Sequence, residues 1–74
     1  MTPIHDLRLV AGDLSVHVRI RQIRGRWIAS ADTPKGPSIG VSWFPCDALV
    51  AALEPFDGLV YELMSTAPHH LVGD

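Results

Sequence analysis

The part of the sequence best suited to binding chemistry is a run of arginines. Four of the six basic residues, Arg19, Arg21, Arg24 and Arg26, lie within eight positions of an alternating stretch that turns at Gly25. Guanidinium groups pair with carboxylates and phosphates, so such a cluster can bind an acidic protein or a nucleic-acid backbone. Because the chain has a net charge of −2, the cluster is a local basic patch on an acidic protein.

Three interpretations of this patch remain open. His17, Arg19 and Arg21 would project as an evenly spaced row from one face, and the patch would bind an acidic protein partner. They would suit nucleic acid less well, because Trp27 has the phase of a core residue and leaves no aromatic platform for bases. They would otherwise form a solvated face whose charges oppose edge-to-edge pairing of the sheet.

Catalytic chemistry has weaker support in the sequence. Cys46 is the single cysteine and stands at an expected helix start, where the helix dipole activates a thiol. A nucleophile also needs a base, and no spacing links Cys46 to any histidine; the four are His5, His17, His69 and His70. These histidines and one thiol do not make a zinc pattern, and the carboxylates are too dispersed for an acid and base pair. We expect no enzyme activity, no cofactor and no metal.

Size and composition favour self-association. A chain of 74 residues buries only about 60% of its unfolded surface, which leaves its stability marginal. One cysteine excludes an internal disulfide, while a hydrophobic content of 47% is high for so short a chain, so we expect a homodimer. Trp43 and Phe44 are adjacent and point to opposite faces of a strand. This pair is either the dimer contact or is buried under the following helix.

Alternation of apolar and polar residues predicts the strands. Residues 16–21 and 27–32 alternate strongly and are joined by a short turn at Gly25. Residues 38–44 form a further strand after a turn rich in proline and glycine, and residues 4–10 an optional first strand.

Two positions depart from simple alternation. Ile23 falls out of phase with the strand before it, which predicts a bulge or the onset of the turn. Gly40, inside an expected strand, predicts a bulge or a close approach of another backbone.

Prolines and apolar stripes predict the helical part. Pro45 suits the first position of a helix, and the apolar stripe that follows is Ala48, Leu49, Ala52 and Leu53. Pro55 should stop or kink this helix. Asp57 is the expected N-cap of a second segment, whose stripe is Leu59, Val60, Leu63 and Met64. A strand over residues 59–63 is the alternative.

The sequence therefore predicts an α+β domain of order β-β-β-α-α. Its sheet is a three- to four-stranded antiparallel meander, with one kinked or two C-terminal helices packed on one face. Residues 1–74 form a single domain in which residues 67–74 are a loose tail. The chain has no basic and apolar leader and no run of roughly 18 apolar residues, so we expect a soluble, cytoplasmic protein with no membrane contact.

Short motifs spread over residues 14–54 carry a family resemblance. They are Gly25-Arg26-Trp27-Ile28-Ala29, Asp32-Thr33-Pro34, Gly36, Gly40 and Asp47-Ala48-Leu49. In this order they resemble the HicB-like family of antitoxin-related domains. The resemblance implies homodimers or higher oligomers and, in antitoxins, the masking of a small basic or RNA-cleaving toxin. The chain has no Pro-Gly-Cys turn after its second strand and no DNA-binding segment after Met64, so operon repression is not implied.

Overall fold

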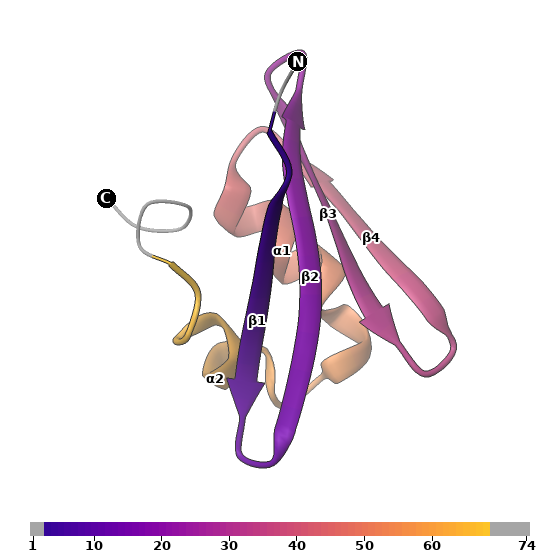
Figure 1. The fold of residues 1–74 in the computed structure, drawn as a ribbon, viewed down its shortest axis with the longest axis vertical. Coiled ribbons are helices and arrows are strands. Elements are labelled where there is room, and N and C mark those ends of the chain that lie inside the picture. The colour runs from indigo at the N-terminus through magenta and orange to yellow at the C-terminus, as the bar shows by residue number, and fades with distance from the viewer. Residues whose placement is uncertain (1–2, 69–74) are drawn as a thin grey trace.

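The computed structural model describes residues 3–68, which form one sheet and one layer of helices (Figure 1). The elements are β1 (His5–Ala11), β2 (Leu14–Ile23), β3 (Arg26–Thr33), β4 (Gly36–Ser42), α1 (Pro45–Ala52), the 3-10 turn η1 (Glu54–Phe56) and α2 (Val60–Met64). Strands that follow one another in the chain pair antiparallel, so the sheet order is β1-β2-β3-β4. The predicted α+β class with the strands first is confirmed, and the optional first strand is a full edge strand.

The turn between β2 and β3 depends on two residues with positive φ. Arg24 and Gly25 make this connection with φ values of 53° and 85°. A two-residue connection with both φ values positive is a type I′ turn, whose twist matches that of the flanking strands. Pairing stays regular up to Ile23 and Arg26. β2 therefore has no bulge at Ile23, and the turn begins only after it. Ile23 keeps the regular alternation and lies 38% exposed on the face opposite to Ile20.

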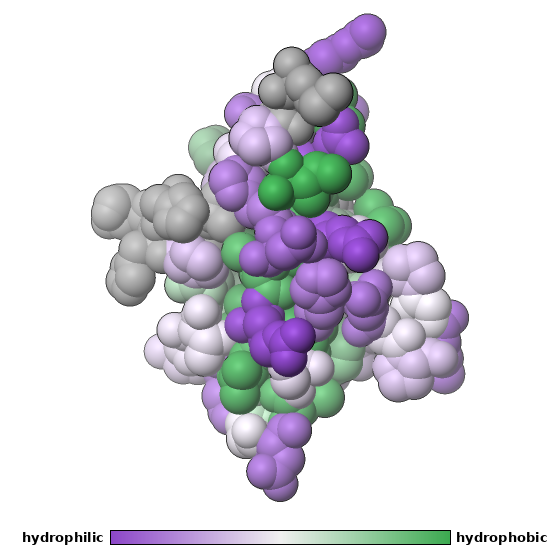
Figure 2. Space-filling model, in the orientation of Figure 1, coloured by the Kyte–Doolittle hydropathy of each residue, from purple (hydrophilic) through white to green (hydrophobic). Residues whose placement is uncertain are grey.

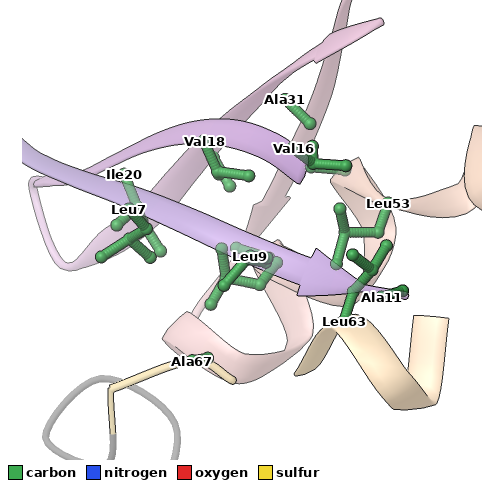
Figure 3. Packing of buried hydrophobic residues seen from close by; sticks show 14 residues of the cluster. Leu7, Leu9, Ala11, Val16, Val18, Ile20, Ala31, Leu53, Leu63 and Ala67 are labelled. Carbon is green, nitrogen blue, oxygen red and sulfur yellow. The ribbon is translucent and has the colours of Figure 1, made fainter. Parts of the chain in front are cut away.

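One face of the sheet carries the core. In the middle of β1 and β2 alternate residues place buried aliphatic side chains on this face, and these are Leu7, Leu9, Val16, Val18 and Ile20. On β3 the same face carries Ala29 and Ala31. Figure 3 shows these strand side chains in one cluster with Leu53 and Leu63 of the helical layer, which lie at the end of the cluster near Ala11 and Val16. Within residues 3–68 no polar or charged residue is buried, so apolar packing holds the two layers together.

Helix α1 lies very close to β4 at one point, which is Gly40. A Cβ at this position would lie 2.6 Å from the Ala52 nitrogen, 2.9 Å from the Ala51 Cβ and nearer still to the Ala48 carbonyl oxygen. Any side chain here would therefore push the helix off the strand. The close backbone approach predicted at Gly40 is confirmed, and its regular pairing with Ala29 shows that there is no bulge.

Prolines mark the helix boundaries as predicted. Pro45 is the first residue of α1, directly after Phe44 at the N-cap. The helix has ended at Ala52 before Pro55, which lies in η1. The apolar stripe predicted for this helix is buried in full, since Ala48, Leu49, Ala52 and Leu53 are all 0% exposed.

The start of the second helix differs from the prediction. The N-cap residue of α2 is Leu59, with no side-chain cap, so the N-cap predicted at Asp57 is wrong. Asp57 instead ends η1, and Gly58, with a φ of 91°, redirects the chain before α2 begins. The helical conformation of Val60–Met64 also removes the strand alternative.

The chain after α2 returns to the edge of the sheet. The Thr66 hydroxyl oxygen accepts a hydrogen bond of 3.0 Å from the Val10 backbone nitrogen on β1. Ala67 is 6% exposed and belongs to the core, although the loose tail was expected to begin there. The rest of that predicted tail, from residue 69 onward, lies outside the described residues. Among residues 3–68 there is no helix long and apolar enough to cross a membrane.

Candidate binding surface

The face of the sheet that points away from α1 and α2 has no covering layer within residues 3–68, and we call it the open face. Its side chains are the alternate residues of each strand, opposite to those of the core. Figure 2 views the molecule with the helices behind the sheet. Hydrophilic side chains gather over the middle of this view, and hydrophobic ones lie between and beside them.

A charged cluster occupies the open face across β1, β2 and β3. His17 lies between two carboxylates, with Nε2 3.1 Å from Asp6 Oδ1 and Nδ1 3.4 Å from Asp32 Oδ2. Arg19 Nε is 3.4 Å from the same Asp6 oxygen. These side chains are 36–68% exposed, and exposed ion pairs stabilise a fold by at most about 1 kcal/mol each. Sequence reasoning missed the cluster because only the strand register brings Asp6 and Asp32 to His17.

The other three arginines of the hairpin have no acidic neighbour. Across residues 3–68, none of Arg21, Arg24 and Arg26 takes part in an ion pair. Arg21 is half-buried, and its Nε atom is shielded from solvent without a hydrogen-bond partner. It lines a shallow pocket of about 230 Å³ whose walls are Ile4, Arg19, Ile20, Arg21, Ile28 and Ser30. A shielded donor without an acceptor costs about 1–3 kcal/mol, so the guanidinium of Arg21 stands at this pocket without its charge being neutralised by the described chain.

Strands β3 and β4 place apolar side chains on the open face. We call the set the β4 strip, and its members are Ile28, Ile39, Val41 and Trp43. The three contributed by β4 and the residue after it are 51–60% exposed, and Ile28 is half-buried. The residues of β4 that face the helices are the small ones, Ser38, Gly40 and Ser42. The alternation predicted for this strand is present, with its apolar members toward solvent.

Trp43 lies at the same end of the open face as the unpaired arginines. The guanidinium carbon of Arg26 is 5.0 Å from the centre of the Trp43 ring. The ring also lies against the β2–β3 turn, where a Cβ on Gly25 would be 3.3 Å from Trp43 Cζ3. Trp27 packs against the core as predicted. The expectation that no aromatic residue accompanies the arginines is nevertheless wrong, because β4 supplies one at its end.

The adjacent pair Trp43 and Phe44 is exposed on both members, at 60% and 65%. Burial under the following helix, which was one of the two alternatives for this pair, is therefore excluded. Phe44 is the N-cap residue of α1 and lies just beyond the strip. Its place in a dimer contact remains a prediction.

The groups considered for catalysis do not converge in the described part of the chain. Cys46 is a half-buried residue in the first turn of α1. A groove of about 550 Å³ lies on the helical layer and is lined by Glu54, Asp57 and aliphatic side chains, with no histidine, cysteine or basic residue among them. Among residues 3–68 no group of three or more potential ligands could hold a metal ion. His69 and His70 lie outside the described residues.

Charge separates between the two layers. Residues 45–68 contain no lysine or arginine and four carboxylates, which are Asp47, Glu54, Asp57 and Glu62. All six basic residues belong to the strands and their turns. The open face is thus the basic side of the molecule, and the helical layer is the acidic side.

The chain was compared with known proteins. No family model, curated protein or solved structure matches it.

Proposed function

We propose that the chain is a small non-enzymatic protein-binding domain that takes an acidic protein partner on its open face. The observation that carries the proposal is Arg21, whose shielded Nε has no acceptor in the described part of the chain. Ile4 and Ile28 line the same pocket. A partner carboxylate would accept from Arg21, and apolar partner residues would cover the two isoleucines. An acidic segment with alternating apolar side chains offers both groups.

Nucleic acid is a second candidate, and the observation that favours it is Trp43 beside Arg26. Aromatic rings together with arginines bind single strands by stacking and by phosphate contacts. A protein partner fits better because Ile39 and Val41 make up much of the β4 strip. Aliphatic side chains provide neither a stacking surface nor hydrogen bonds to bases.

The HicB-like resemblance supports a more specific form of the proposal, in which the domain is an antitoxin or a stand-alone relative of antitoxins. A small basic toxin would be attracted by the four carboxylates of residues 45–68 rather than by the arginines. Coexpression with the product of the neighbouring reading frame tests this form. Relief of a growth defect by the chain would support it, and no effect on growth would contradict it.

The binding proposal can be tested with two labelled probes. One is a peptide that alternates glutamate with leucine, and the other is a single-stranded RNA of similar length. We expect Arg21→Gln to weaken peptide binding at least about tenfold, because the peptide carboxylate loses a charge-assisted hydrogen bond. Lys35→Gln, which removes the same charge at the exposed β3–β4 turn, is the matched control and should bind the peptide normally.

Two outcomes would decide against an acidic protein partner. Peptide binding that does not depend on Arg21 would remove the observation on which the proposal rests. RNA binding that weakens steeply between about 50 mM and 200 mM salt, and is lost when Arg19 and Arg21 are both changed to alanine, would favour the nucleic-acid candidate.

A further inference from the structure

The β4 strip is an apolar surface that the described chain leaves uncovered. On β4 the large apolar residues all point to solvent, although the opposite arrangement would have placed them in the core. They cannot face inward, because α1 approaches too closely for any side chain at Gly40. Trp43 alone, 60% exposed, presents on the order of 100 Å², since an aromatic side chain buries about 150–250 Å² when fully covered. The strip is therefore large enough to be the centre of an interface.

The open-face residues of β3 and β4 would match those of a second copy whose strands run in the opposite direction. On the open face β3 carries Arg26, Ile28, Ser30 and Asp32, and their neighbours along β4 are Trp43, Val41, Ile39 and Pro37. A two-fold axis that lies across the strands between Ile28 and Ser30 relates two copies, so that one end of this set in one copy faces the other end in the second copy. It brings the cation of Arg26 to the carboxylate of Asp32, the ring of Trp43 to Pro37, and Val41 to Ile39.

We propose that a second copy of this chain covers the β4 strip in this antiparallel, face-to-face arrangement. Each copy would then place Arg26 against Asp32 of the other, which gives two ion pairs flanking an apolar centre. Asp32 already faces His17 through one oxygen, Oδ2, and a carboxylate has a second oxygen with which to accept from arginine. Because the contact is isologous, it closes at two copies and leaves no free apolar strip.

The dimensions of the molecule agree with this occupant. The sheet is a broad face of a molecule that measures 34 × 28 × 17 Å. That face can supply the roughly 800 Å² that each partner buries in a stable interface. Two twisted sheets that pack face to face cross at about 30° and diverge away from the centre. Arg21 pairs with Ile28 in the strand register and so lies beside this contact. Because Ile28 belongs both to the β4 strip and to the pocket beside Arg21, a second copy and an acidic partner would compete for this part of the open face.

The first test is the mass of the protein in solution, measured by light scattering. We expect a dimer at micromolar concentration for the unmodified chain, and a monomer for Val41→Glu, which puts a carboxylate in the centre of the strip. Val50→Glu places the same charge on α1, at a position 42% exposed, and should remain dimeric. A monomeric parent, or a dimeric Val41→Glu, would overturn the proposal. Ile39→Glu, also on the open face, replaces Val41→Glu if circular dichroism shows that variant unfolded.

The second test addresses the arrangement of the two copies. Arg26→Asp and Asp32→Arg should each weaken the dimer at least about tenfold, because each sets like charges against one another twice. Mixing these two variants should give a one-to-one heterodimer, since every contact then joins an arginine to an aspartate. Native mass spectrometry of the mixture measures the fraction of heterodimer. Two variants that stay monomeric when mixed, or that each dimerise normally alone, would overturn the antiparallel arrangement.

Discussion

The two faces of the sheet are built from the same four strands, yet most of their large apolar residues lie on opposite halves. On the covered face the buried aliphatic residues of the sheet belong to β1 and β2, whereas β3 and β4 contribute alanine, serine and glycine, together with the partly buried Trp27 near the start of β3. On the open face the order is reversed. There β1 and β2 carry most of the charges, and β3 and β4 carry the β4 strip.

This reversal follows from how closely each helix lies to the sheet. Helix α1 contacts β3 and β4 tightly enough to exclude side chains at Gly40. Leu63 of α2 packs on the half of the sheet where β1 and β2 supply large aliphatic residues. The large side chains of β4, Ile39 and Val41, and Trp43 after it therefore point away from the helix to solvent. The covered face thus provides the core, and the open face leaves the apolar residues of β4 exposed.

The largest expected loss of stability comes from truncating a large side chain on the covered face. Leu9→Ala removes a side chain that is 0% exposed, and we expect the free energy of unfolding to fall by about 3 kcal/mol. Val10→Ala shortens the next residue, which is 40% exposed, and should cost less than about 1 kcal/mol. Urea unfolding at one fixed protein concentration measures both, because a dimer unfolds at a concentration-dependent midpoint. Equal losses of unfolding free energy in Leu9→Ala and Val10→Ala would contradict the assignment of Leu9 to the covered face and Val10 to the open face.

A smaller effect is expected from pushing α1 off the sheet. In Gly40→Ala the new methyl group would meet the backbone of Ala48 and Ala52, and overpacking of this kind costs about 2 kcal/mol. Ser38→Ala is the control, because it keeps a small residue on the same face of β4 and should change stability by less than about 0.5 kcal/mol. Urea unfolding again gives the comparison. If Gly40→Ala left the free energy of unfolding unchanged, α1 would not lie as close to β4 as the structure shows.

The smallest of the three effects is at the hairpin turn next to Trp43. Gly25→Ala and Gly12→Ala both place a Cβ on a residue with positive φ, 85° and 59° respectively, at a cost of about 1 kcal/mol or slightly more. At Gly25 the methyl group also approaches the Trp43 ring, whereas nothing lies within 4 Å at Gly12. Gly25→Ala alone should therefore shift the emission of Trp43, measured in a Trp27→Phe background. Identical behaviour of the two variants would place Trp43 away from the turn.

Local patterns were sufficient to predict much of this fold. Alternation gave the strands, Pro45 and Pro55 gave the limits of α1, and Gly40 indicated a close backbone approach. The Asp57 cap was wrong because Gly58 redirects the chain after η1, which residue type alone does not reveal.

The candidate site was less predictable because it depends on contacts between distant residues. Alternation in β4 defines two faces but does not say which one meets α1. The ring of Trp43 joins the arginines only through the β3–β4 register, seventeen positions after Arg26. The arginine row itself was visible in the sequence, but its division into a paired Arg19 and an unpaired Arg21 required the position of Asp6.

The central claim, that a second copy covers the β4 strip, is tested most directly by the two indole N–H signals in an NMR dilution series. Trp43 lies on the open face and Trp27 packs against the core, so the two tryptophans report on the two faces of one sheet. As the protein is diluted from dimer to monomer, we predict that the Trp43 signal shifts and the Trp27 signal stays in place. A Trp43 signal that does not change with concentration, or a shift confined to Trp27, would contradict the account.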